Sequence, residues 1–370
     1  VTLLNFWHMS LEEIRQTRLH KIELLRNAGM DPYPSRSKRT HSIQEVSAAF
    51  SDLEHSKQQI TIAGRVRALR SHGGSTFLDI EDGTGRLQGY VKEDAVGKDS
   101  YDFFHAVVDV GDFIELCGSV FVTKKEEQTV EASEWRMLAK SILPLPEKWH
   151  GLTDTEERYR KRYLDIMFHS DVRERIVRRA RFWRAMRTFF EERRFLEVET
   201  PVLETATGGA DAQPFVTHHN ALDIDVYLRI SCGELWQKRL MVAGFPKVFE
   251  IGRIFRNEGM SAEHLQDYTQ MEFYWAFADY RDGMQLVKEL YQYVAQETFG
   301  TLQFSDGAIS FDLGSEWKEY DFRELMREKS GIDVLHAEVA EIEQKLEELG
   351  VSYDHAQSNK TRAVDALWKQ

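Results

Sequence analysis

The chain has 370 residues, 42% hydrophobic and 29% charged, with a formal net charge of −13. This length predicts two or three domains with sizeable cores, and the acidic balance argues against bulk electrostatic binding of nucleic acid. No run approaches the apolar length of a membrane span, and Cys117 and Cys232 lack metal-binding spacing, so we expect a soluble protein of the reducing cytoplasm.

Residues 1–57 are predicted to form a helical extension. Apolar side chains recur at helical spacing over 11–26, the segment Asn27-Ala28-Gly29 supplies a stop, and a weaker helix follows over 43–53. The other face of the first helix is basic. This basic face fits a solvated surface and an RNA-backbone contact about equally well.

Residues 58–146 are predicted to form five short strands, in which apolar and polar residues alternate, separated by glycine-containing turns. Such a unit predicts a closed Greek-key barrel of the OB type, a fold that binds oligonucleotides on one face. Alternation points Leu78 and Ile80 inward and leaves Phe77 outside, and on the next strand it leaves Gln88 outside. An exposed aromatic beside an amide suits base stacking and base-edge reading, although for Phe77 alone an isolated surface aromatic is the better interpretation.

Residues 147–370 are predicted to form a larger domain whose centre is the stretch 247–279. Two β-prone runs flank a long polar loop there, and loops of this length inside compact domains are usually functional. The period of two assigns the faces of the second strand. Glu272 and Tyr274 share one face, while Phe273, Trp275 and Phe277 share the other.

The order of residues in this stretch resembles motif 2 of the class II aminoacyl-tRNA synthetases, most closely the bacterial-type lysyl-tRNA synthetases. The matching residues are FRNEG, then a histidine, a short acidic-aromatic segment and T-x-M-E-x-Y. FFEERRFLEVETPVL, which contains Pro201, resembles motif 1, whose helix and strand form the dimer interface in this family. TFLDIEDGTGRLQGYV resembles the family's anticodon-binding barrel.

The resemblance implies an α+β chain. A helical extension (1–57) and a five-stranded OB-type barrel that binds the anticodon (58–146) precede a class II catalytic domain (147–370). This last domain is an antiparallel sheet with flanking helices. Motif 3, with an ATP-binding arginine and the ligands of Mg²⁺, is expected beyond Gln370. We therefore expect a sheet that is incomplete at its C-terminal side, no metal ligand within this chain, and little or no adenylation by the 370-residue polypeptide alone.

The resemblance also implies the role of individual residues. Arg256 is expected to be the catalytic residue, bridging the amino acid's carboxylate and the α-phosphate of ATP. The implied lysine-binding residues are Gly209, Glu234, Arg256, Glu272 and Tyr274, the ATP-binding residues Arg256, Glu258, His264 and Tyr268, and the anticodon-binding residues Phe77, Gln88 and Glu134. His218 and His219 lack a third ligand at suitable spacing and are interpreted as structural.

The resemblance implies a lysine–tRNA ligase, a cytoplasmic homodimer that uses ATP and Mg²⁺ to activate L-lysine as lysyl-adenylate and transfers it to tRNA(Lys). Two carboxylates, Glu234 and Glu272, suit a ligand with two ammonium groups, because an unpaired buried ammonium is costly. An aspartyl or asparaginyl enzyme would instead need Lys or Arg at the side-chain end of the pocket. A non-catalytic truncated paralogue that binds tRNA also fits the sequence, whereas an enzyme that lysylates lipid or protein is less favoured because of the barrel.

Overall fold

The computed structural model describes residues 10–146, 152–259, 261, 264–351 and 359–370. The chain divides into two compact units, Val1–Phe168 and His169–Gln370. The first unit extends past residue 146 and includes two short helices, α6 (Thr155–Arg160) and α7 (Arg162–Phe168).

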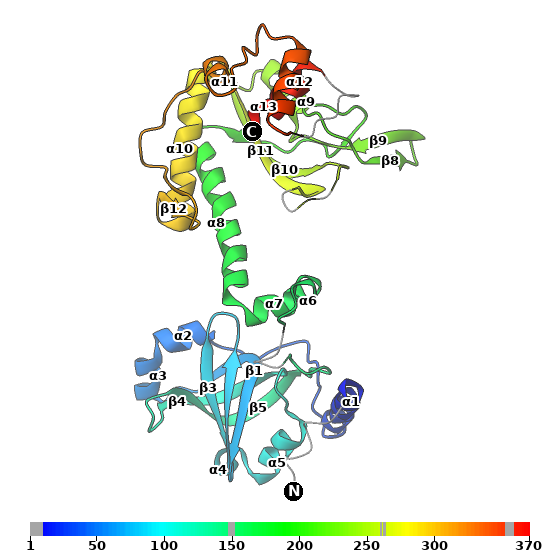
Figure 1. The fold of residues 1–370 in the computed structure, drawn as a ribbon. Coiled ribbons are helices and arrows are strands. Elements are labelled where there is room, and N and C mark those ends of the chain that lie inside the picture. The colour runs from blue at the N-terminus through cyan, green and yellow to red at the C-terminus, as the bar shows by residue number, and fades with distance from the viewer. Residues whose placement is uncertain (1–9, 147–151, 260, 262–263, 352–358) are drawn as a thin grey trace. The chain divides into compact units, whose positions relative to one another are not determined.

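The first unit is built on a closed five-stranded barrel with the strand order β1-β2-β3-β5-β4 (Figure 1). The strands are β1 (Ile60–His72), β2 (Ser75–Glu81), β3 (Arg86–Lys92), β4 (Phe113–Val122) and β5 (Gln128–Ala139). All pairs are antiparallel except β3 with β5, which is parallel. The predicted strands and the barrel are confirmed, because each strand carries the alternating pattern that a half-buried strand needs.

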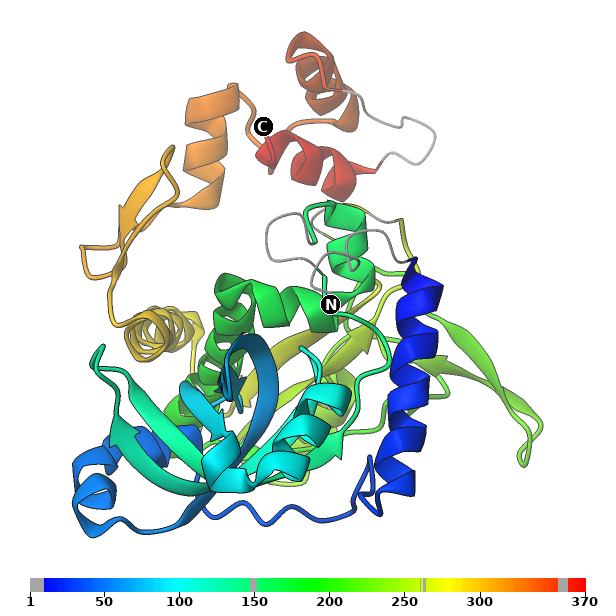
Figure 2. The same ribbon diagram turned by 90° about the horizontal axis from the view of Figure 1, so that it is seen from below.

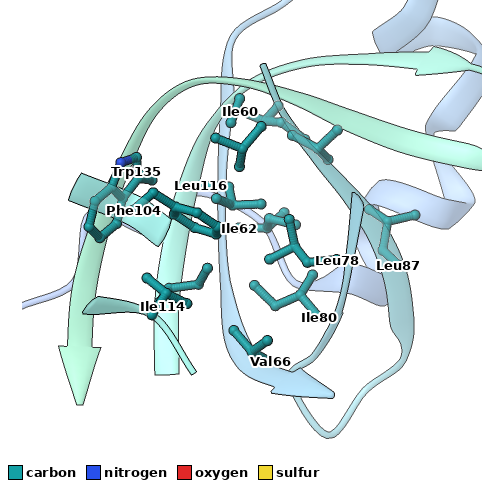
Figure 3. Close-up of a cluster of buried hydrophobic side chains, with 14 of the residues drawn as sticks. Ile60, Ile62, Val66, Leu78, Ile80, Leu87, Phe104, Ile114, Leu116 and Trp135 are labelled. Carbon is teal, nitrogen blue, oxygen red and sulfur yellow. The ribbon is translucent and has the colours of Figure 1, made fainter. Parts of the chain in front are cut away.

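Inward-pointing aliphatic side chains fill the barrel (Figure 3). Leu78 and Ile80 are fully buried, as alternation predicts. Gly89 is required by packing, because a Cβ there would lie 2.6 Å from the Leu116 side chain. The same core includes residues of α1 (Leu11–Asn27), α2 (Ile43–Ala48), α3 (Phe50–Ser56) and α5 (Lys98–Val107), while the short α4 (Glu93–Val96) precedes α5. The single helix predicted over 43–53 is thus two helices that meet at Ala49.

The basic face of α1 is partly buried against the barrel. Arg18 is 7% exposed and donates to the backbone oxygens of Val110, Ser141 and Leu143. Lys21 donates to Asp109 at 2.7 Å, within a cluster that also includes the buried pair of Lys140 and Asp112. The side chains of Arg18 and Lys21 are therefore neither solvated nor available to RNA phosphates. For these two residues, the predictions of a solvated surface and of an RNA-backbone contact are both wrong.

The second unit contains a three-stranded sheet of order β11-β10-β6. Strands β10 (Lys247–Phe255) and β11 (Asp267–Trp275) form the predicted antiparallel hairpin, and the short β6 (Leu196–Glu197) joins β10 in parallel. One face of this sheet packs an aromatic cluster against α8 (Ser170–Glu192) and α10 (Tyr280–Phe299), which lie side by side (Figure 1).

Phe273 and Trp275 belong to this aromatic cluster, but Phe277 does not. The prediction that Phe277 shares their face is wrong, because β11 ends at Trp275 and Phe277 has a φ of 60°. This left-handed turn ends the alternation and leaves the Phe277 ring fully exposed.

A second sheet of order β7-β9-β8 is formed by β7 (Leu203–Glu204), β8 (Val216–His219) and β9 (Ile224–Leu228), and α9 (Glu234–Val242) follows it. The strands β12 (Gln303–Ser305) and β13 (Ser310–Asp312) form a short hairpin whose turn contains Asp306 and Gly307. The helices α11 (Phe322–Ser330), α12 (Val339–Glu348) and α13 (Lys360–Trp368) gather around a small core of their own (Figure 2).

Candidate functional site

The face of the β10–β11 hairpin opposite the aromatic cluster is polar. The register pairs Glu250 with Glu272, so these two carboxylates project from adjacent positions on one face. The period of two adds Tyr268 and Tyr274 from β11, and Arg256 continues this face just after β10. Five titratable side chains therefore share one surface. They include Glu272 and Tyr274, which the alternation along β11 had placed on one face.

Glu272 is held by the turn that leads into α9. Its Oε1 accepts a hydrogen bond from the backbone N–H of Cys232 at 3.0 Å and one from Gln270 Nε2 at 2.9 Å. Burial raises the pKa of Glu272 above its ordinary value, although the Cys232 N–H opposes this shift. The carboxylate is thus oriented before any ligand binds, in a surrounding that favours a cationic partner.

Glu234 is the first residue of α9, and its carboxylate lies beside Gly209 in the loop before β8. Gly209 has a φ of 89°, and a Cβ there would lie 2.5 Å from Glu234 Oε2 and 2.2 Å from Ser231 Oγ. A glycine is therefore required for the loop to approach the carboxylate this closely. Glu234 forms an ion pair with Lys238 one helical turn later, and burial together with Glu234 raises the pKa of Tyr274.

A buried ion pair that sequence reasoning missed supports this face. Arg229 Nη1 and Glu250 Oε1 lie 2.5 Å apart, and each side chain is only 4% exposed. Arg229 Nε also donates to the carbonyl of Arg253, and Glu250 accepts from the Thr200 hydroxyl at 2.7 Å. A Cβ on Gly252 would lie 2.1 Å from Arg229 Nη2, so a glycine makes room for the guanidinium.

Arg256 and Tyr268 lie together at the end of the hairpin. The guanidinium carbon of Arg256 is 5.7 Å from the centre of the Tyr268 ring, and the Arg256 backbone N–H donates to Gln266 O. Glu258 and His264 lie in the loop between the strands and are exposed. Glu258 accepts a hydrogen bond from the Gln213 backbone at 3.3 Å, and His264 contacts Ser261. Among the loop residues that the structure describes, no hydrogen bond or ion pair joins Glu258 or His264 to Arg256.

The geometry suits a small zwitterion that carries an additional cation. Two carboxylates, Glu234 and Glu272, lie beside Tyr274, and the electrostatic interaction between them is repulsive until a cation neutralises it. Arg256, further along the same face, offers a planar donor for a carboxylate or a phosphate.

The outer face of the barrel brings together two of the three residues predicted to bind the anticodon, Phe77 and Gln88. Phe77 on β2 stacks on Tyr90 of β3 with 4.5 Å between ring centres, and Phe121 of β4 lies 6.0 Å from Tyr90. Gln88 is two residues before Tyr90 on the same outer face, so it is the diagonal neighbour of Phe77. The three aromatic rings form an aromatic row with the Gln88 amide beside it.

Glu134 is not brought to this aromatic row. The residue of β5 in register with Tyr90 is Glu131, and Glu134 lies three residues further along the strand, past a bulge. Three residues of strand correspond to about 10 Å. Glu134 is exposed and forms a long ion pair of 3.9 Å with Lys38.

The remaining candidates are not catalytic by geometry. His218 lies in the exposed β8–β9 hairpin and pairs with Asp223 and Asp225. Burial raises the pKa of the Cys232 thiol to about 12, which keeps it protonated and unreactive. Across the described ranges, no group of three or more His, Cys, Asp or Glu side chains is placed to hold a metal ion.

Comparison with known proteins gives a family for each of the two domains. Residues 154–361 match the family described as tRNA synthetases class II (D, K and N), and residues 60–138 match the OB-fold nucleic acid binding domain. The lysine–tRNA ligase of Thermotoga maritima is 41% identical over 96% of this chain and 71% of its own length. Those of Carboxydothermus hydrogenoformans and Bacillus subtilis are 44% and 43% identical over 88% of this chain and 66% of their own lengths.

Proposed function

Because this chain belongs to the class II tRNA synthetases of the D, K and N group, we propose that it activates L-lysine with ATP and transfers it to tRNA(Lys). The chain is an aminoacyl-tRNA ligase by family, and its curated relatives are lysine–tRNA ligases. The observation that carries the choice of amino acid is the convergence of Glu234, Glu272 and Tyr274 beside Gly209.

Lysine recognition follows from charge. The α-ammonium and ε-ammonium groups of lysine each need an anionic partner once they leave water, since a desolvated unpaired charge costs several kcal/mol. Glu234 and Glu272 supply two such partners, and the hydrogen bonds to Glu272 from Cys232 and Gln270 hold one of them in place. Glu234 exchanges its partner Lys238 for the substrate ammonium.

Adenylation joins two anions, and Arg256 neutralises them. An oxygen of the lysine carboxylate forms a bond to the α-phosphorus of ATP, while the bond from this phosphorus to the bridging oxygen breaks and pyrophosphate leaves. A planar guanidinium contacts both the carboxylate and the α-phosphate through separate N–H donors. We assign adenine stacking to Tyr268, the adenine amino group to Glu258 and the distal phosphates to His264.

Magnesium is proposed to enter with ATP, where it would neutralise phosphate charge.

We further propose that Phe77, Gln88 and Glu134 contact the anticodon of tRNA(Lys), and that the protein is a cytoplasmic homodimer. Large apolar side chains exposed on α8, β6 and β7 support the dimer: Ile176, Leu196 and Leu203 are each about half exposed. None of the helices in the described part of the chain has the length and apolar character of a membrane span.

The test is ATP–pyrophosphate exchange by the full-length enzyme, not by residues 1–370 alone, with lysine, aspartate or asparagine as the only amino acid. We expect exchange with lysine alone. Exchange that depends on aspartate or asparagine would show that this amino acid, and not lysine, is the substrate. No exchange with any of the three, combined with retained tRNA binding, would favour a non-catalytic, tRNA-binding protein. Arg256→Ala supplies the control for exchange by a contaminating enzyme.

A further inference from the structure

We propose that a groove between α10 and the segment 313–320 is a docking site for an acidic peptide segment that carries an apolar anchor side chain. The groove has a volume of about 440 Å³. Its lining combines three cations with apolar side chains: Arg281, Lys288, Lys318, Met284, Val287 and Trp317. None of these residues is assigned to lysine, ATP or the anticodon, so the inference does not rest on the proposed function.

One wall of the groove is a stripe of side chains along α10. Arg281, Met284 and Lys288 recur at spacings of three and four residues, so their side chains lie on one face of the helix. Two acids of the same helix, Asp282 and Glu289, line a different cavity. The helix thus separates its charges, and the stripe at the groove is positive.

The other wall is the chain that follows β13 and runs back along α10 (Figure 1). Two hydrogen bonds to the backbone oxygen of Leu313 hold this chain on the helix. Gln292 Nε2 donates at 2.7 Å, and Trp317 Nε1 donates at 3.0 Å. The Trp317 ring also packs edge-on against Tyr291, with 6.0 Å between ring centres. The groove is therefore formed before any partner binds, so its walls lose little conformational entropy on binding.

The three cations of the groove lack carboxylate partners. Within the described ranges of the chain, no ion pair joins Arg281, Lys288 or Lys318 to an acid, and the Arg281 guanidinium lies 5.3 Å from the centre of the Tyr280 ring. The described lining contains one acid, Glu319, so its net charge is positive. In a chain whose net charge is −13, such a group of cations favours an anionic partner.

Exposed apolar side chains accompany these cations. Met284 is 47% exposed and lies between Arg281 and Lys288 on the stripe, and Trp317 on the other wall is 36% exposed. A thioether and an indole ring offer adaptable contact to an aliphatic or aromatic side chain. Because Arg281 and Lys288 are only about 10 Å apart along the helix, a short segment that buries an anchor on Met284 also brings its acids to both cations.

A peptide fits this lining better than a nucleic acid does. The net negative charge of the chain repels a polyphosphate at long range, and three cations release few counterions. Glu319 also repels a phosphate, whereas its carboxylate can accept a hydrogen bond from a peptide N–H. The lining therefore favours a peptide with acidic side chains around an apolar one.

The test uses fluorescence anisotropy to measure how a short fluorescein-labelled peptide, in which glutamates flank a leucine, binds the full-length protein. Two companion peptides replace the glutamates by glutamine or the leucine by serine. Lys288→Met and Met284→Ser each change one side chain of the groove that lies outside the core. Arg327→Met is the matched control, because Arg327 is an exposed cation of α11 outside the lining of the groove.

The Kd of the glutamate–leucine peptide is expected to rise about two- to fivefold in Lys288→Met, as for the loss of one exposed ion pair. The glutamine peptide is expected to bind Lys288→Met and wild type equally. Met284→Ser is expected to remove the preference for leucine over serine. Arg327→Met is expected to match wild type. ATP–pyrophosphate exchange with lysine is expected to be unchanged in all three variants, which checks that they are folded.

Three results would overturn the inference. The first is no saturable binding of the glutamate–leucine peptide by wild type, or the same Kd in Lys288→Met as in Arg327→Met. The second is tighter binding of a single-stranded oligouridylate that Lys288→Met abolishes, which would assign the groove to nucleic acid. The third is self-association in sedimentation that Lys288→Met abolishes, which would assign it to a second copy of the chain. Each of these results leaves exchange with lysine untouched, so the proposed function is tested separately.

Discussion

Replacing Arg229 by methionine is expected to lower the free energy of unfolding of the second unit by about 3–5 kcal/mol. Methionine roughly preserves the volume of the side chain but removes the cation. Glu250 then keeps its hydrogen bonds from Thr200 but loses the guanidinium 2.5 Å away, at a position where its side chain is 4% exposed. The carbonyl of Arg253 loses its donor as well.

The magnitude is set by the charge left without a partner. The Coulomb attraction of the pair is largely offset by desolvation while both ions are present, so the intact pair adds little net stability. Removing one ion leaves the full desolvation cost of the other. Because domains are stable by only about 5–15 kcal/mol, the loss is a large fraction of the total.

The assay is urea denaturation followed by tryptophan fluorescence, with hydrogen exchange in β10 to identify the unit that unfolds, since two units can unfold separately. The double variant Arg229→Met with Glu250→Met removes both charges. It is expected to be more stable than Arg229→Met alone, with a coupling of about 2–3 kcal/mol between the two sites. Additive losses in the double variant, or a loss below about 1 kcal/mol in Arg229→Met, would refute the reasoning.

Further predictions concern ligand binding. Lysine affinity, measured by calorimetry across pH, is expected to fall as Glu272 becomes protonated; because burial raises the pKa of this acid, the loss begins at a higher pH than for an ordinary carboxyl, and Glu272→Gln should abolish this acid limb. Gly209→Ala is expected to weaken lysine binding more than tenfold and leave ATP binding unchanged, because the Cβ would meet Ser231 and Glu234; equal losses for both ligands would contradict this. Phe77→Ala is expected to weaken binding of a uridine-containing hairpin RNA by about 1–3 kcal/mol in anisotropy titrations, and unchanged affinity would exclude a stacking role.

Local periodicity predicts the barrel and one face of the candidate site. Leu78 and Ile80 are buried because a strand alternates its side chains, and the same rule puts Glu272 beside Tyr274. It fails at Phe277, since a left-handed residue ends the strand and alternation contains no information about such a turn.

The polar contacts between distant strands were not predictable in the same way. Arg229 and Glu250 are charged residues that single-sequence reasoning assigns to the surface. Only the folded chain, which places the residue after β9 beside β10, makes them a buried pair. The alternation of side chains offered a signal for Glu250, because it lies on the same face of the hairpin as Arg256, which follows β10. The contact of Gln88 with Glu127 joins residues 39 apart and follows from the parallel pairing of β3 with β5.

The contacts of Arg18 also determine how the first unit responds to mechanical tension. This side chain links α1 to residues 123 and 125 positions later, where the chain leaves the last strand of the barrel. A pulling force applied where the chain leaves β5 therefore acts first on the hydrogen bonds of the Arg18 guanidinium and on the ion pairs of Lys21 and Lys140. The barrel strands are expected to remain in register until these contacts break. Unfolding by force is therefore expected to begin with release of α1, before any strand pair separates.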